Sequence, residues 1–173
     1  PRGCPVRAAS RGRHGTEGHG TGWSATWGDG ERSTPGRYGG DTLVRAKTFP
    51  TVTGTIRLID CMPVRDEAPD VVRIVEGVSG RVDVRMALTI RFDYGQVVPW
   101  VRGHHDGIEA VAGPDSLRLR TPVPTRGEGM STIAAFTVRP GDRVPFVLTW
   151  NPSHLPPPKP VNAEHALRDH SDF

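Results

Sequence analysis

Lysine, cysteine and long apolar runs are scarce in this chain of 173 residues. Lys47 and Lys159 are its only lysines, although the formal net charge is +3. The positive charge therefore comes almost entirely from arginine. GC-rich coding produces such a bias as readily as selection for phosphate binding does, so the charge by itself does not predict a nucleic-acid-binding protein.

The two cysteines, Cys4 and Cys61, lie in segments of very different composition. A disulfide framework is therefore not expected, and a reducing compartment fits better, with Cys61 as a small buried apolar residue. No apolar run approaches the roughly 18 residues that a membrane span needs. The first residues also lack the apolar core of a secretion signal. We expect a cytoplasmic protein without a membrane partner.

The first 37 residues are rich in Gly, Arg, Ser, Thr and His and contain few large apolar side chains. Such a segment buries too little apolar surface to offset the entropy lost on ordering, so we expect a disordered leader over residues 1–37. The alternative is a basic and aromatic surface on which single-stranded nucleic acid stacks. The members of that surface would be Arg13, Trp23, Trp27, Arg32 and Arg37. We favour the leader and expect no nucleic-acid partner.

From residue 42 onward, apolar residues recur at every second position. The clearest run begins at Val82, where apolar residues alternate with Asp83, Arg85 and other mostly polar residues. A period of two is typical of a half-buried strand and excludes an amphipathic helix. The side chains expected to face the core are Val82, Val84, Met86, Leu88, Ile90 and Phe92.

Further strands and turns follow the same pattern. Strands are expected around Leu117 and Leu119, over residues 144–150, and at 53–60, 71–76, 108–111 and 132–138. The sequence Arg139-Pro140-Gly141-Asp142 predicts a type II turn, since Pro favours its second position and Gly its third. Residues 77–80 and 113–115 predict similar corners. Because no helical period separates the strands, we predict an all-β fold, an antiparallel β-sandwich over residues 38–150.

Proline dominates the segment that follows. Residues 151–161 predict an extended, polyproline-like linker that is stiff. Asn162 is a suitable helix N-cap, and residues 162–173 favour helix, so we expect the start of a linker helix there. A helix of about three turns is marginal without a surface to pack against.

The sequence contains only weak signals for a metal site or a catalytic site. His104, His105 and Asp106 are adjacent, but neighbouring side chains on an extended segment point in opposite directions, so a polar hairpin loop is favoured over a metal site. No pair among the carboxylates has a catalytic spacing, and solvated strand ends and loops explain them better; these are Asp60, Asp66, Glu67 and Asp70. We expect no metal and no cofactor.

The stretch "RFDYGQVVPW", residues 91–100, closes the long alternating run. Arg91 and Asp93 are expected to share one strand face, and Gly95 then allows the chain to turn or bulge. Tyr94 and Trp100 have two interpretations. They cap the sandwich core, which we favour, or they stand at an exposed rim where aromatics contact sugars or a neighbouring domain.

Four segments in order carry a resemblance to a known family: "TGTIRLIDCMPVRD", "DVVRIVEGVSGRVDVRMALTIRFDYGQVVPW", "AVAGPDSLRLRTPVP" and "FTVRPGDRVPFVLTWNPSHLPPPKPVNAEHAL". The series resembles the N-terminal β-domain of bacterial glycoside hydrolase family 15 proteins, the trehalase and glucoamylase-like group, over residues 38–173. The resemblance implies a large antiparallel supersandwich followed by a helical linker and an (α/α) barrel. It also implies a non-catalytic scaffold role in an enzyme that acts on the α-glucosidic bonds of trehalose or an α-glucan.

The resemblance also limits what is expected of this chain. Family members use one glutamic acid as general acid and another as general base, and both lie in the barrel, so no catalytic residue is carried over here. Members begin with a β-rich segment that residues 1–37 do not match, so we expect a truncated or frame-shifted start and an incomplete sandwich. The expected partner is the barrel of the same protein. The expected interdomain or substrate-rim contacts are Arg91, Asp93, Tyr94 and Trp100. The alternative function is a stand-alone carbohydrate-binding β-sandwich.

Overall fold

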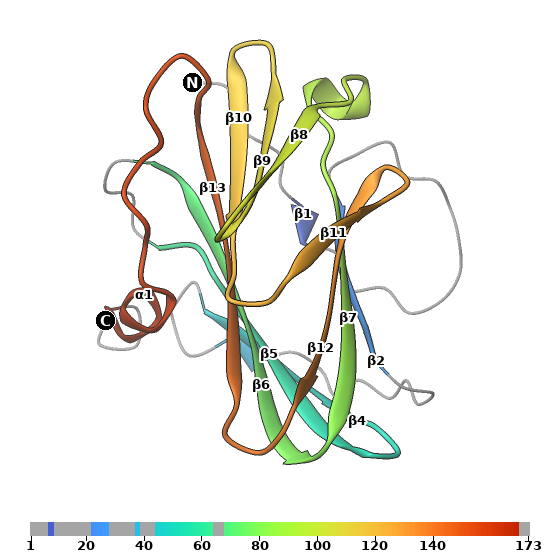
Figure 1. Cartoon of the computed structure of the whole chain (residues 1–173). Coiled ribbons are helices and arrows are strands. Elements are labelled where there is room, and N and C mark those ends of the chain that lie inside the picture. The colour runs from blue at the N-terminus through green and yellow to red at the C-terminus, as the bar shows by residue number, and fades with distance from the viewer. Residues whose placement is uncertain (1–6, 9–21, 28–36, 39–43, 64–67, 170–173) are drawn as a thin grey trace.

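The computed structural model of the chain describes residues 7–8, 22–27, 37–38, 44–63 and 68–169. Within them two β-sheets face each other, and one short helix lies on the outside (Figure 1). The eight-stranded sheet contains, in spatial order, β3 (Arg37–Tyr38), β4 (Arg45–Pro50), β5 (Gly54–Cys61), β6 (Asp70–Gly80), β13 (Arg143–Pro152), β10 (Asp115–Arg120), β9 (Gly107–Ala112) and β8 (Trp100–His104). The five-stranded sheet contains β1 (Arg7–Ala8), β2 (Gly22–Trp27), β7 (Val82–Thr89), β12 (Ser131–Val138) and β11 (Thr125–Glu128).

Paired strands are antiparallel, apart from the parallel pair β1 and β2. The predicted all-β sandwich is confirmed, and so are the strands expected from alternation, which correspond to β5, β6, β7, β9, β10, β12 and β13. The structure adds β4, β8 and β11, whose sequences show no clear alternation.

The core between the sheets contains the residues that the alternation predicts. Val82, Met86 and Leu88 on β7 are each 1% exposed, whereas Asp83 and Arg85 between them are exposed. The facing side chains from the eight-stranded sheet include Ile56, Leu58, Val75, Leu117, Leu119, Phe146 and Leu148. The expected inward set of β7 is therefore confirmed.

The rings of Phe136 on β12 and Phe146 on β13 lie across the two sheets, with their centroids 5.7 Å apart. They are tilted by 44° relative to each other. Aromatic pairs at this separation favour offset or tilted arrangements, so this contact ties the two sheets together at the level of these strands.

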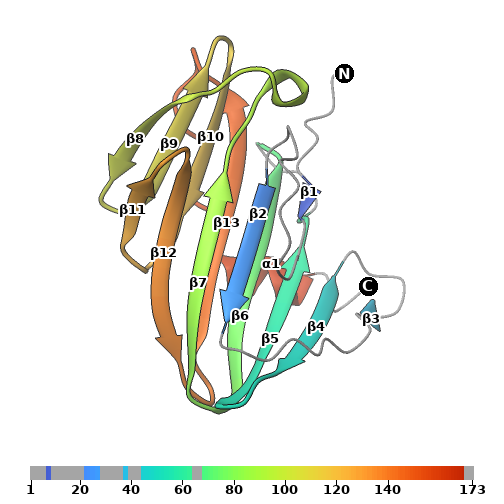
Figure 2. The ribbon, with the colours of Figure 1, turned by 90° about the vertical axis from the view of Figure 1, so that its right-hand side faces the viewer.

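Tight corners pass the chain from one sheet to the other at the lower end in Figure 2. The turn Arg139 to Asp142 joins β12 to β13, and the N–H of Asp142 donates to the carbonyl oxygen of Arg139 over 3.0 Å. Gly141 has a φ of +87°, as a type II turn requires at that position. Gly77 lies within β6 beside this turn, and a Cβ there would stand 2.0 Å from the carbonyl oxygen of Arg139. The corner expected over 77–80 lies at its end, where Gly80 has a φ of +67°.

The helix α1 (Ala163–Asp169) packs on the outer face of the eight-stranded sheet (Figure 1). Its Ala163 and Ala166 are buried in a second apolar cluster with residues of β5, β6 and β13, which are Ile59, Cys61, Val72, Ile74 and Val147. Cys61 is a free thiol, as expected a small buried residue, and burial raises its pKa to about 11. The central strands are therefore covered on both faces.

The C-terminal segment differs in part from the expected linker over 151–161. β13 continues to Pro152, and a turn follows, in which the N–H of Leu155 donates to the carbonyl oxygen of Pro152 over 3.1 Å. The expected N-cap is confirmed, because Oδ1 of Asn162 accepts the N–H groups of Glu164 and His165, each at 3.0 Å. No described helix is long and apolar enough to cross a membrane.

Most of the leader expected over residues 1–37 lies outside the described residues, as do Arg13 and Arg32 of the alternative nucleic-acid surface. The structure differs from the expectation at β2, which pairs with β7 along all six of its residues. Composition averaged over the whole segment conceals this strand, because the strand forms by pairing with β7, which lies far away in the sequence.

We predict that Leu88→Asp lowers the free energy of unfolding by about 4 kcal/mol, because it buries an unpaired charge. Thr89→Asp is the matched control one residue away, where the side chain is only partly buried, and should cost about 1 kcal/mol. Urea unfolding followed by circular dichroism measures both, and Leu88→Ala provides a milder variant. Equal losses at the two positions would show that the inward face is assigned wrongly.

Candidate functional site

The stretch after β7 forms a tight corner. Phe92 and Val97 bridge, with the N–H of each donating to the carbonyl oxygen of the other at 2.9 and 3.1 Å, and the ring of Phe92 is buried. The 3₁₀ turn η1 (Asp93–Gly95) lies between them. Asp93 and Tyr94 have φ values of 48° and 55°, in the left-handed region that costs most L-residues about 1–2 kcal/mol each. The structure thus confirms a corner here.

The corner exposes its large apolar side chains. Tyr94 is 84% exposed and Trp100, the first residue of β8, is 73% exposed. We call the exposed group the corner patch; its members are Tyr94, Val97, Val98, Trp100 and Val101. The favoured expectation that Tyr94 and Trp100 cap the core is wrong, because the buried Phe92 holds the corner while the backbone turns the two aromatics outward.

The polar residues of the corner are arranged differently from the sequence expectation. Arg91 and Asp93 do not share a strand face, because β7 ends at Thr89 and Asp93 has a left-handed backbone. Nη1 of Arg91 donates to the carbonyl oxygen of Ile90 over 2.8 Å, and Asp93 is exposed. Tyr94 and Trp100 are both exposed on the segment that leads from the corner into β8, with Asp93 at the turn.

A second group of polar residues lies on the outer face of the eight-stranded sheet. We call it the polar cluster; its members are Asp70, Asp106, Arg118, Arg120 and Thr149. Oγ1 of Thr149 donates to Asp70 over 2.5 Å, and Nη2 of Arg118 donates to Asp106 over 3.2 Å. Arg120 lies between the two carboxylates, with Nη1 3.4 Å from Oγ1 of Thr149 and Nε 3.6 Å from Oδ2 of Asp106.

The polar cluster also holds the Pro-rich segment on the sheet. Nη2 of Arg120 donates to the carbonyl oxygen of Pro158 over 3.0 Å. Burial raises the pKa of Asp70, although its hydrogen bond from Thr149 and the charge of Arg120 oppose the rise. Burial also tends to raise the pKa of Asp106, but the hydrogen bond and charge of Arg118 outweigh it and lower the pKa. These charges are matched within the cluster, which is typical of a structural network rather than a catalytic one.

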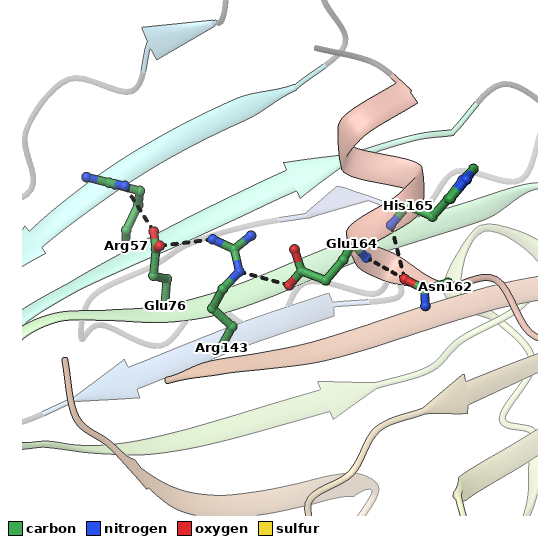
Figure 3. A network of polar contacts seen from close by, with 6 residues as sticks. All are labelled: Arg57, Glu76, Arg143, Asn162, Glu164 and His165. Carbon is green, nitrogen blue, oxygen red and sulfur yellow. Dashed lines mark hydrogen bonds and ion pairs between the residues drawn. The ribbon is translucent and has the colours of Figure 1, made fainter. Parts of the chain in front are cut away.

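A chain of ion pairs joins α1 to the sheet (Figure 3). Glu76 on β6 accepts from Arg57 at 3.0 Å and from Arg143 at 2.9 Å, the residues directly opposite it on β5 and β13. Nε of Arg143 also donates to Oε1 of Glu164 on α1 over 2.8 Å. The sequence carries no local signal for this network, because its members are brought together only by strand register.

The histidines of the predicted hairpin lie as expected. His105 and Asp106 form the turn between β8 and β9, and Nε2 of His104 is 3.5 Å from Oε2 of Glu109. Among the described residues, no three His, Cys, Asp or Glu side chains are grouped to hold a metal ion.

The interpretation of the carboxylates as solvated strand ends and loops is wrong for Asp60 and Asp70. Asp70 is buried, and Asp60 accepts hydrogen bonds from Nε and Nη2 of the buried Arg73 at 2.6 and 2.9 Å. Asp66 and Glu67 lie outside the described residues.

Comparison with known proteins identifies no relative of this chain. The chain matches no protein-family model, and it has no significant match among curated proteins. The arrangement of its own residues therefore has to support any assignment of function.

We predict that Asp70→Asn changes how stability depends on pH. Because the pKa of Asp70 is higher in the folded chain than in the unfolded one, the folded state binds the proton more tightly, and wild type gains stability as pH falls through the folded pKa. Asn has no proton to bind, so the variant lacks this gain. The free energy of unfolding of wild type relative to Asp70→Asn should therefore rise as pH is lowered from about 7 to about 4.

Urea unfolding at several pH values measures this difference. Asp93→Asn is the matched control, because Asp93 is an exposed carboxylate whose backbone conformation Asn also accepts. A difference that stays constant with pH, or that moves in favour of Asp70→Asn at low pH, contradicts the assignment of Asp70 as a carboxylate disfavoured by burial.

Proposed function

We propose that this chain is the non-catalytic β-domain of a trehalase or glucoamylase-type glycoside hydrolase, acting as a scaffold for an (α/α) barrel of paired helices. The four segments that carry the family resemblance contain β5, then β6 and β7 with the first residue of β8, then the end of β9 with β10, and then the end of β12 with β13 and most of α1. They therefore include the central strands of the eight-stranded sheet, β7 of the facing sheet and the docked helix, which supports a scaffold role.

The observation that carries the proposal is the corner patch. Tyr94, in a turn with two left-handed non-glycine residues, is 84% exposed, and Trp100 at the start of β8 is 73% exposed. Strained backbone of this kind, together with large exposed apolar side chains close by in the chain, is typical of surfaces that bind a partner. Tyr94 and Trp100 are suited to the centre of such an interface, because aromatics supply large contact areas at low entropic cost.

The second candidate function is a stand-alone carbohydrate-binding sandwich. The same exposed indole and phenol favour it, because sugar rings stack on aromatic faces, and the neighbouring carboxylate of Asp93 could accept hydrogen bonds from hydroxyl groups. In the scaffold role Tyr94 and Trp100 would contact the helical barrel, and in the carbohydrate-binding role they would contact a sugar. Binding experiments with the two ligands therefore distinguish the candidate functions.

We predict that the chain binds the isolated helical barrel of a family 15 hydrolase, and that Trp100→Ala and Tyr94→Ala each weaken the affinity about tenfold or more. Val52→Ala is the matched control. Val52 is 85% exposed in the turn between β4 and β5, at the opposite end of the sandwich (Figure 1), and its loss should leave the affinity unchanged. Isothermal titration calorimetry measures all four proteins, after circular dichroism has established that the barrel is folded.

A folded barrel that does not bind, or that binds all variants equally, contradicts the scaffold role. Titration of trehalose and maltooligosaccharides into the chain alone tests the second candidate. Saturable sugar binding that is lost in Trp100→Ala, without binding of the barrel, would replace the scaffold with the carbohydrate-binding module.

A further inference from the structure

The four terminal strands of the two sheets differ in how they are protected from further pairing. β1 and β3 have two residues each, and β11 has four, with Arg126 and Glu128 ion-paired at 3.3 Å. β8 is the longest of the four, with five exposed residues, which are Trp100, Val101, Arg102, Gly103 and His104. Proteins guard sheet edges with short strands and charges, so among the described strands β8 is the least guarded edge. Figure 2 shows it at the left margin of its sheet.

The register of the hairpin determines which backbone groups of β8 face outward. His104 pairs with Gly107 across a two-residue turn, and the closing pair of such a hairpin exchanges both of its N–H···O bonds. Since hydrogen-bonded pairs alternate along an antiparallel ladder, Trp100 and Arg102 also point their backbone groups at β9. The N–H and C=O groups of Val101 and Gly103 therefore point away from the sheet.

We propose that β8 pairs antiparallel with β8 of a second copy of this chain, about a two-fold axis at Val101, so that two eight-stranded sheets join edge to edge. In this register Val101 and its symmetry mate exchange both backbone hydrogen bonds. The N–H of Gly103 donates to the carbonyl oxygen of Pro99 in the other copy, where proline needs to supply only an acceptor. The inference does not rest on the proposed function.

Charge selects this register over its neighbour. With the axis at Val101, Trp100 of each copy lies beside Arg102 of the other, so a guanidinium meets an indole on the same face of the joined sheet at two symmetric places. With the axis one residue further along, at Arg102, the two Arg102 side chains would lie directly opposite each other, which is destabilising. The first arrangement thus gives Trp100 a cationic neighbour and avoids the contact between like charges.

The size of the contact sets its strength. A strand of five residues buries less area than a standard stable interface does, so the dimer should be weak and should form in the micromolar range. The corner patch continues the same edge, and a helical partner seated there would compete with the second copy.

Sedimentation velocity of the full chain from about 1 to about 200 µM tests the pairing. Wild type should pass from monomer to dimer over this range. Val101→Pro removes a backbone N–H that points to the second copy and not to β9, and an outward position on an edge strand accepts proline. It should raise the dissociation constant about tenfold or more, with an unchanged circular dichroism spectrum.

A pair of charge variants tests the register. Trp100→Glu places a carboxylate beside Arg102 of the other copy and should keep the dimer, although it removes the most exposed apolar side chain of β8. Trp100→Arg places like charges there and should abolish the dimer, and it leaves Arg102 opposite Glu109 of its own hairpin. These variants also separate this inference from the scaffold role, because Tyr94→Ala should weaken barrel binding but not dimerisation.

Three results would overturn the inference. The first is a wild-type chain that stays monomeric throughout the range. The second is a dimer that Val101→Pro leaves intact, which would place the contact elsewhere. The third is loss of the dimer in Trp100→Glu, or growth of wild type into larger species without a dimer plateau, which would indicate unspecific apolar association.

Discussion

Burial of β5, β6 and β13 on both faces is the constraint on which the rest of this structure depends. One face of these strands meets the five-stranded sheet, with Ile56, Val75 and Phe146 in the core. The other face carries Ile59, Val72, Ile74 and Val147 under α1. Each fully buried aliphatic side chain contributes about 1.5–3 kcal/mol, so the seven-residue helix is stable here although it would be marginal alone.

The same constraint divides the eight-stranded sheet into regions with different roles. Near its centre the outer face is covered by α1, which the ion pairs of Glu76, Arg143 and Glu164 hold in place. Further along, the polar cluster of Arg120 and its neighbours holds the Pro-rich segment. At the margin, β8 is covered by none of these, and its side chains are all exposed. This margin and the corner patch therefore form an uncovered surface of the described sheet.

The sequence predicted those parts of the fold in which periodicity reflects burial directly. The alternating side chains of β7, the turn at Gly141 and the cap at Asn162 each follow from a local rule, and the structure contains all three. The sheet to which each strand belongs could not be predicted in the same way. β6 and β7 are separated only by Arg81, yet they lie in different sheets, because the corner at Gly80 redirects the chain.

The corner at residues 91–100 was predicted, but the favoured orientation of its two aromatics was not the one observed. The stretch 91–100 was expected to form a corner, and it does, but Tyr94 and Trp100 point outward rather than into the core. Composition cannot distinguish these outcomes, since an aromatic residue beside a turn can be buried in the core or exposed to solvent. The burial of Phe92 was predicted from the alternation. The decisive feature is the left-handed backbone of Asp93 and Tyr94 after it, which depends on tertiary packing.

Native-state hydrogen exchange, followed residue by residue by NMR in dilute protein, tests most directly the claim that the two-sided strands stabilise this fold. Amides of β6 and β13 should exchange only through global unfolding and should be the slowest among the described residues. The amides of Val101 and Gly103, which point away from β9, should exchange much faster than those of Trp100 and Arg102 in the same strand. If the slowest amides lie in β8 or β11, or if β6 exchanges as fast as β8, then the strands buried on both faces do not stabilise the fold.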